Sequence, residues 1–353
     1  MAVETGKPPR ERARGAPGAP GWSPGAAALA LGRRFLTLRE GSVIVITIVV
    51  AVYFTATTDA FFTEDNFKTL LPYFAPFAIL AAGEVFLMIN GEIDLSIGAV
   101  YLFAPFLFYE VNNGGMALVP SLVVAMLACV AVGLFNGFFT TVVGINSFIT
   151  TLGTLFGLTG FTLIISHAQP VSTPGTTSVG EMSTFANVFG GGTYSQLIWA
   201  LAVVVVLQIV LSLTRWGIYT VAVGGNRHGA GEAGIHVRLV IIRNFILCSL
   251  CAGLVGVLEA VRTTSVTPDP AGATGVLLDA IAAAVIGGTL LAGGSGTVVG
   301  ALIGALFLGI LRDGLTIKGV NADYLDFYLG LAIIIAMAAN TYVGRVRRGS
   351  GGV

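Results

Sequence analysis

The sequence predicts an all-α integral membrane protein of about ten transmembrane helices, some of them short or broken. Of its 353 residues, 55% are hydrophobic and 10% are charged, whereas an ordinary soluble domain carries about a quarter charged residues. Apolar runs of about bilayer-crossing length recur along the whole chain and leave no soluble domain of any size. Glycine-bearing polar stretches interrupt these runs, which indicates helices that break inside the membrane.

Ten apolar segments are predicted as spans, several of them shorter than the ideal length. The third, eighth and ninth each need neighbouring glycine-rich residues to complete a crossing. In chain order, the predicted spans are residues 42–56, 70–89, 97–108, 116–143, 148–165, 197–213, 239–258, 277–291, 298–311 and 325–342.

The regions that flank the transmembrane domain, residues 41–343, are predicted to be cytoplasmic tails. Residues 1–40 are mostly disordered in this interpretation, because the first 25 are rich in Pro, Gly, Ala and basic residues and lack a signal-peptide core. Within them, residues 26–40 form either a short amphipathic helix on the membrane surface or a plain linker. Residues 344–353 form the second tail.

The Lys and Arg residues predict the orientation. If both termini are cytoplasmic, fourteen of the 18 basic residues lie inside and four lie outside: Lys68, Arg262, Arg312 and Lys318. This excess follows the positive-inside rule.

Three glycine-bearing stretches are candidates for a passage through the membrane: "GEIDLSIG" after the second span, "GGN" at 224–226 and "IGGTLLAGGSGTVVG" at 286–300. Irregular backbone at membrane depth is tolerated only where protein or a water-filled path surrounds it. The alternative is tight helix packing through small residues. The candidate path residues in these stretches are Asn90, Gly91, Asp94, Ser96, Gly287, Gly288 and Thr289.

Among the acidic residues in or beside the spans, two interpretations stay open for Asp94 and for Glu84. Asp94 or Ser96 can accept a backbone N–H at the start of the third span, or Asp94 contacts a substrate directly. Glu92 is then expected at the aqueous mouth. Glu259 is three residues before Arg262, which predicts a surface ion pair. Glu84 has no evident partner and is either a path residue or a protonated, hydrogen-bonded packing residue.

No catalytic or metal-binding constellation is predicted. The three histidines are scattered, the three cysteines lie in apolar runs, and the sequence has no GxxxxGK[ST] phosphate loop. No cofactor and no nucleic-acid partner are therefore expected. If ATP drives a process here, another chain must bind it.

Four stretches together resemble one family. They are "GEIDLSIGAV", "FNGFFTTVVGINSFITTLGTLFGLTG" from Phe135, "VAVGGNRHGAGEAGIHV" from Val221 and "LDAIAAAVIGGTLLAGGSGTVVGALIGALFLGIL" from Leu278. Their order is kept over residues 61–340. In these stretches the chain resembles the membrane-spanning permeases of bacterial sugar-importing ABC transporters, of the ribose, xylose and galactose type.

The resemblance implies a multi-pass, ten-helix subunit of the bacterial inner membrane that is itself no enzyme. It would pair with a second permease, the same chain or a related one. A cytoplasmic ATPase would bind ATP and Mg, and an extracytoplasmic binding protein would deliver a monosaccharide or related polyol for import by alternating access. The loop that docks on the ATPase would carry Gly224, Gly225, Asn226, Glu232, Ala233, Gly234 and Ile235.

Two departures from the family and two other functions stay open. Many relatives have glycine where this chain has Glu92, and Gly229 and Gly231 are expected to weaken the docking helix. A permease for branched-chain amino acids is one alternative, although "GEIDLS" favours sugar. A secondary transporter that couples to protons through Glu84 is the other. The absence of clustered His, Cys or Ser groups disfavours a membrane enzyme or a structural protein.

Overall fold

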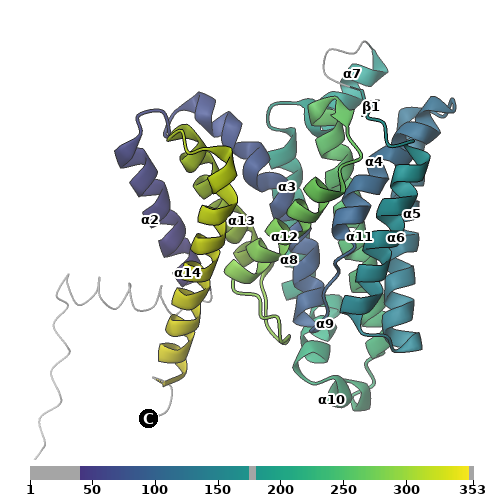
Figure 1. The fold of residues 1–353 in the computed structure, drawn as a ribbon. Helices are drawn as coiled ribbons and strands as arrows, with labels where there is room; N and C mark the ends of the chain where they lie inside the picture. Colours follow the sequence, from purple (N-terminus) through teal and green to yellow (C-terminus); the bar gives the residue numbers. More distant parts are fainter. Residues whose placement is uncertain (1–39, 175–179, 350–353) are drawn as a thin grey trace, which may run out of the picture. The chain divides into compact units, whose positions relative to one another are not determined.

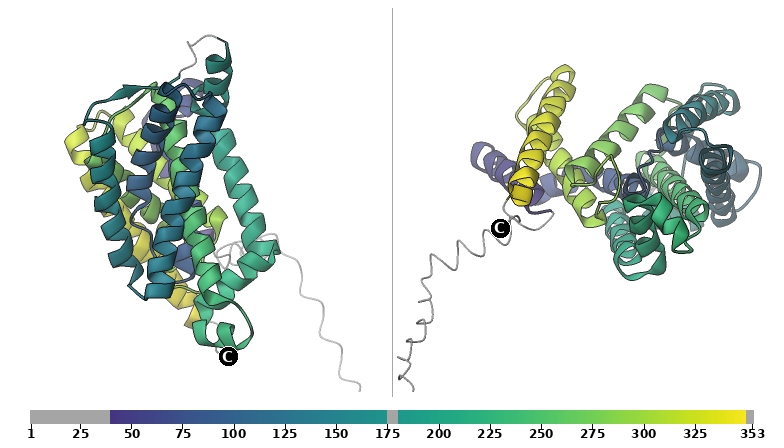
Figure 2. Two further views of the ribbon diagram at one scale, coloured as in Figure 1. Left: turned by 90° about the vertical axis from the view of Figure 1, so that its right-hand side faces the viewer. Right: turned by 90° about the horizontal axis from the view of Figure 1, so that it is seen from below.

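The computed structural model describes residues 40–174 and 180–349, and there the chain is almost entirely helical (Figures 1 and 2). The helices are α2 (Gly41–Thr57), α3 (Glu64–Ile89), α4 (Ile97–Asn113), α5 (Leu118–Phe138), η1 (Phe139–Val143), α6 (Ser147–Ile165), α7 (Glu181–Ala186), η2 (Asn187–Gly191), α8 (Ser195–Leu213), α9 (Arg215–Gly225), α10 (Arg227–Glu232), α11 (Val237–Thr263), α12 (Pro270–Ile286), α13 (Val298–Ile317) and α14 (Ala322–Gly349). The strands β1 (Val171–Ser172) and β2 (Ser265–Val266) pair antiparallel. The predicted tail at 1–40 lies outside the described residues except for Glu40.

Each of the ten predicted spans coincides with a helix, which confirms the all-α fold class of a multi-pass membrane protein. Among the described residues, six helices are long and apolar enough to cross a bilayer: α3, α5 together with η1, α6, α8, α11 and α13. The number of ten crossings and the cytoplasmic position of the termini stay predictions.

Helix α12 begins before the predicted span at 277–291 and ends inside it, because local capping decides both ends of the helix. α12 begins at Pro270, where proline occupies the first turn and the Asp269 carboxylate accepts the N–H of Ala271 at 3.0 Å. It ends at Ile286, and Gly288 then takes a positive φ of 91°. The apolar residues from 287 to 291 are therefore not helical.

Helix α3 is the centre of the helical domain. It packs against α8, α11, α12 and α13 (Figure 1). In the most apolar 18-residue segment of α3, 83% of the residues are buried, whereas in that of α6 only 22% are. Helix α3 is therefore surrounded by protein, and most of the surface of α6 is exposed.

Three interruptions of the helices position the candidate site. The first break, residues 90–96, separates α3 from α4. The second break, residues 224–226, consists of the last two residues of α9 and of Asn226, which separates α9 from α10. The third break, residues 287–297, separates α12 from α13. Helix α9 is not among the predicted helices. It begins after Thr214, whose hydroxyl accepts the N–H of Gly217 at 3.5 Å.

The connection from α6 to α8 and the connection from α9 to α11 lie at opposite ends of the helices. Helix α10 is at one end, whereas α7 and the strand β1 are at the other (Figure 1). The chain thus offers separate surfaces for partners at its two ends.

Candidate functional site

The three breaks meet at the carbonyl group of Ile89, the last residue of α3. The N–H of Gly294 donates to this oxygen at 2.7 Å. Gly224 approaches it so closely that a Cβ atom there would lie 1.8 Å from the oxygen. A Cβ atom on Gly293 would lie 3.0 Å from the backbone nitrogen of Gly91. Segments that are far apart in the sequence are therefore in backbone contact, which only residues without side chains permit.

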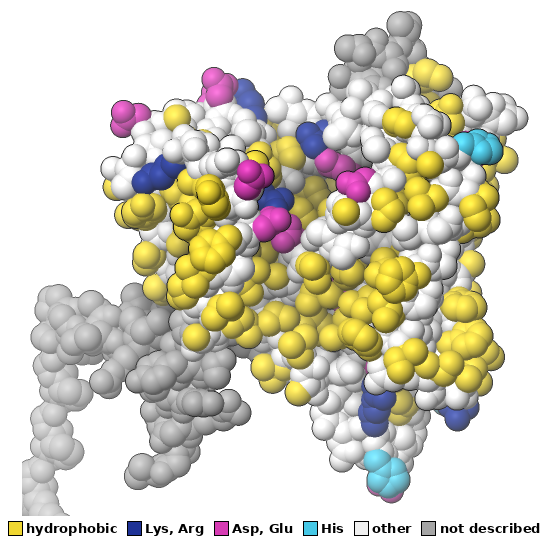
Figure 3. All heavy atoms as spheres, viewed as in Figure 1, with side chains coloured by type: hydrophobic (Ala, Val, Ile, Leu, Met, Phe, Trp, Pro, Cys, Tyr) yellow, Lys and Arg dark blue, Asp and Glu magenta, His cyan; other side chains and the backbone are white. Residues whose placement is uncertain are grey.

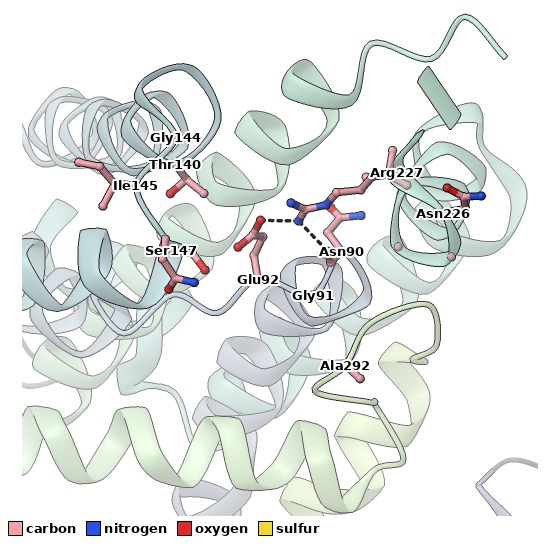
Figure 4. A pocket seen from close by; sticks show the side chains of 14 residues that line it. Asn90, Gly91, Glu92, Thr140, Gly144, Ile145, Ser147, Asn226, Arg227 and Ala292 are labelled. Atoms are coloured by element: carbon pink, nitrogen blue, oxygen red, sulfur yellow. Dashed lines mark hydrogen bonds and ion pairs between the residues drawn. The ribbon is translucent and has the colours of Figure 1, made fainter. Parts of the chain in front are cut away.

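A polar cleft of about 450 Å³ opens beside this meeting point (Figure 4). It is lined by residues 90–92, 144–147 and 223–227, with Thr140 and Ala292. Five of the predicted site residues line it: Asn90, Gly91, Gly224, Gly225 and Asn226.

An ion pair joins the first and second breaks in this cleft. Arg227, the first residue of α10, pairs with the carboxylate of Glu92 and donates at 2.9 Å to the carbonyl oxygen of Asn90. Figure 4 shows the guanidinium group between these two acceptors. Glu92 was expected to face the aqueous mouth. It does line the cleft, but it is buried there, with only 7% of its surface exposed. The sequence did not predict a role for Arg227, because no local pattern shows that residues in two separate loops are in contact.

A network of buried amides holds α9 and α11 against the end of α3. The Asn244 side chain is fully buried; its amide donates to the side-chain oxygen of Asn90 at 2.6 Å and accepts from the Trp216 indole at 2.7 Å. Asn90 in turn donates to the carbonyl oxygen of Thr220 at 2.7 Å. Of these residues the sequence analysis found Asn90 alone. An amide side chain within a helix that is otherwise mostly apolar was the available signal for Asn244.

Asp94 and Ser96 form a second buried network and do not line the cleft. One carboxylate oxygen of Asp94 accepts from the backbone N–H of Ser96 at 2.8 Å and from its hydroxyl at 2.6 Å. The predicted capping role is thus present for Asp94, whereas Ser96 makes no cap hydrogen bond of its own. The Asn136 amide donates to the Ser96 hydroxyl at 2.8 Å, and the Thr154 hydroxyl donates to the Asn136 oxygen at 2.6 Å. This network holds α4, α5 and α6 together.

Glu84 and Glu259 differ in the way the sequence predicts. Glu259 accepts from Arg262 at 2.5 Å, which confirms the ion pair, and also from Gln196 at 2.7 Å. Glu84 is fully buried within α3, and neither of its carboxyl oxygens has a hydrogen-bond partner in the described part of the chain. It does not line the cleft.

The predicted residues of the third break lie at the end of α12, where α12 and α13 are in close backbone contact. A Cβ atom on Gly287 would lie 2.3 Å from the carbonyl oxygen of Gly300. Gly288 has the positive φ that ends α12, and Thr289 is 2% exposed. These three residues therefore belong to the end of α12 and do not line the cleft. Their positions support the alternative that the glycines here serve tight helix packing.

The far end of α10 is a free surface. Glu232 is the last residue of this helix, and Glu232, Ala233 and Gly234 are exposed. Gly234 turns the chain with a φ of 83°, and the N–H of Ile235 closes the turn on the Ala230 carbonyl oxygen at 3.0 Å. Helix α10 has six residues. The expectation that Gly229 and Gly231 weaken it stays a prediction.

One charged contact lies between helices that the sequence analysis assigned to spans. Arg312 of α13 approaches Asp279 of α12 at 3.7 Å and Asp326 of α14 at 3.5 Å. Acidic and basic side chains gather there between α14 and α12, bordered by apolar surface (Figure 3). Because lipid tails do not solvate such charges, we expect water or protein to cover this face.

Within residues 40–174 and 180–349, no group of three His, Cys, Asp or Glu side chains is arranged to hold a metal ion. The site is built from glycine backbone, amides and an ion pair whose carboxylate is buried. Such an arrangement is suited to holding and moving helices, as a membrane permease requires.

Comparison with known proteins agrees with this class. Residues 66–337 match the family described as the permease component of branched-chain amino acid transport systems, and the chain belongs to that family. No solved structure matches it.

The similar proteins include several sugar permeases. The chain is 38% identical to the xylose/arabinose import permease protein XylH of Sulfolobus acidocaldarius, over 89% of this chain and 86% of the relative. It is 33% identical to the ribose import permease protein RbsC of Escherichia coli, over 87% and 96%, and 30% identical to the D-allose transport system permease protein AlsC of the same organism, over 87% and 93%. The predicted resemblance to sugar-import permeases is thereby confirmed.

Proposed function

We propose that this chain is the transmembrane subunit of an ATP-driven importer for a monosaccharide or related polyol. The observation that carries the proposal is the meeting of the three glycine-bearing breaks at Ile89, beside a cleft that includes the start of α10. A partner that moves α10 would thereby move the ends of the membrane helices, as alternating access requires. The sugar class is supported by the relatives that import xylose or arabinose, ribose and allose.

In this proposal the chain works in a bacterial inner membrane with both termini in the cytoplasm. The partner ATPase, which binds ATP and Mg, docks on the exposed end of α10, through Glu232, Ala233, Gly234 and Ile235 together with residues 224–226. A sugar-binding protein docks at the opposite end, and a second permease, either another copy or a related chain, completes the path. Asp279, Arg312 and Asp326 form a charged face that lipid tails would not solvate. This face supports the presence of a second permease or of a water-filled path beside it.

Labelling tests the orientation on which this function depends. In an Asn226→Cys variant, a membrane-impermeant maleimide is expected to react in inside-out vesicles and not in right-side-out vesicles. The native Cys129, Cys248 and Cys251 are buried and provide the unreactive background. Reaction from the outside would overturn the proposal, since a cytoplasmic ATPase could not reach α10.

Substrate class is tested with the binding protein that belongs to this permease. Xylose, arabinose, ribose and allose are compared with leucine in a thermal-shift assay, and at least one sugar is expected to stabilise the binding protein. Stabilisation by leucine alone would favour the branched-chain amino acid alternative, which the family description keeps open.

Replacing Glu84 by Gln distinguishes the ATP-driven permease from a proton-coupled transporter. We expect sugar uptake by Glu84→Gln to stay within about twofold of the original and to stop when the ATPase is inactive, because the neutral isostere keeps the packing of a side chain without partners. Uptake is measured in cells with and without an uncoupler of the proton gradient. Uptake that runs without the ATPase and is lost in Glu84→Gln would support the secondary transporter.

A further inference from the structure

We propose that the ion pair between Arg227 and Glu92 is the positioning link through which α10 moves the break between α3 and α4 during transport. The inference rests on the proposed function and names the residues that connect the docking helix to the membrane helices. Neither residue is among the predicted path or docking residues.

The burial of Glu92 makes this link persistent. The side chain of Glu92 is 8% exposed, whereas that of Arg227 is 49% exposed. A carboxylate removed from water is costly unless it is paired, and breaking one partner away leaves an uncompensated buried charge. Glu92 is therefore expected to stay with Arg227 when α10 is displaced.

The guanidinium group holds the first break on both sides of Gly91. It donates to the carbonyl oxygen of Asn90, directly before Gly91, and pairs with Glu92, directly after it. Gly91 has a positive φ of 75°, so it is the residue at which the chain leaves the helical path of α3. Both contacts come from the same guanidinium nitrogen, Nη2, so a single group of α10 connects the residues on either side of this turn.

Other side-chain contacts do not provide the same connection. In the part of the chain that the structure describes, Arg227 is the one α10 residue whose side chain forms a hydrogen bond or ion pair with another element. The His228–Glu232 pair stays within α10, and Asn226 caps the helix through the N–H of Gly229 at 2.9 Å. The Asn90–Thr220 hydrogen bond reaches α9 rather than α10. The mechanical connection of α10 to α3 is therefore assigned to Arg227.

A double-mutant cycle in the complete importer tests the link. Permease, ATPase and binding protein are reconstituted in liposomes, and sugar uptake and ATP hydrolysis are measured together for Arg227→Gln, Glu92→Gln and the double variant. Each single change is expected to lower the sugar transported per ATP at least about tenfold while hydrolysis continues. The double variant is expected to be no worse than the poorer single one, because the effects of contacting residues are not additive. The charge-conserving Arg227→Lys is expected to recover part of the ratio.

The Arg262–Glu259 pair supplies the matched control, since it is an ion pair of the same chemistry outside the cleft. Arg262→Gln and Glu259→Gln are expected to leave the ratio of sugar to ATP unchanged. Co-elution of the ATPase and the thermal midpoint show whether each variant is folded. Additive losses, or an unchanged ratio in folded Arg227→Gln, would refute the link while leaving the proposed function intact. Absence of ATP-driven sugar uptake by the original importer would instead refute the proposed function.

Discussion

Replacing Gly224 by alanine is expected to abolish transport and lower the thermal stability of the permease. The new Cβ atom would lie 1.8 Å from the carbonyl oxygen of Ile89 and 3.0 Å from the nitrogen of Gly294. Both are backbone atoms, so α3 or α9 would have to move. Ordinary overpacking costs about 1 to 3 kcal/mol, and this clash is more severe, so we expect a destabilisation of about 3 kcal/mol or more. Sugar uptake in vesicles and the thermal midpoint in detergent measure the two effects.

The neighbouring glycine is the control for this variant. Gly225 lines the same cleft, but a Cβ atom there would have no other atom within 4 Å. Gly225→Ala is therefore expected to keep both uptake and thermal stability close to those of the original protein. Equal losses in the two variants would show that the second break needs flexible glycine in general, and that the contact with Ile89 is not the cause.

The positions of the helices could be predicted because bilayer-length apolar runs are a local property of the sequence. The ten predicted spans all coincide with helices, and "GGN" and "GEIDLS" were recognised as breaks. Helix ends were less predictable, since capping decides them. The apolar residues after Ile286 extended the predicted eighth span, although the positive φ of Gly288 ends α12.

The contacts of the site could not be predicted, because they join residues from separate parts of the chain. Glycine composition marked the three breaks, yet nothing in the sequence showed that all three meet at Ile89. The same limit explains Arg227, which appeared only as one of many cytoplasmic charges. Glu92 was noticed as a departure from the family, and its partner became evident only from the fold.

Asp94 shows how far local reasoning extends. The expectation was that Asp94 or Ser96 accepts a backbone N–H at the start of α4, and the Asp94 carboxylate accepts that of Ser96. The additional contact of Ser96 with Asn136 of α5 depends on helix packing and was not predicted. The side-chain capping alternative is therefore supported by geometry, whereas direct contact of Asp94 with sugar stays a prediction.

Replacing Asn244 by leucine is expected to give the largest loss of stability among substitutions of similar volume. Asn244 is fully buried and bonds Asn90, Trp216 and the carbonyl oxygen of Phe86. Leucine would leave the Trp216 indole and the Asn90 side-chain oxygen without their partner. Because a buried polar group without a partner costs about 1 to 3 kcal/mol, the two together are expected to cost about 2 to 6 kcal/mol. Chemical unfolding in detergent, followed by the fluorescence of Trp216, measures this loss.

Asn112 offers the comparison at the surface. Its amide donates at 2.8 Å to the carbonyl oxygen of Met116 in an exposed turn, where water can replace the lost partner. Asn112→Leu is therefore expected to change the free energy of unfolding by less than about 1 kcal/mol. If Asn244→Leu were equally mild, the buried amide network would not be what fixes α9 and α11 on the end of α3. Movement of α10 would then reach the membrane helices through Arg227 and Glu92 without that support.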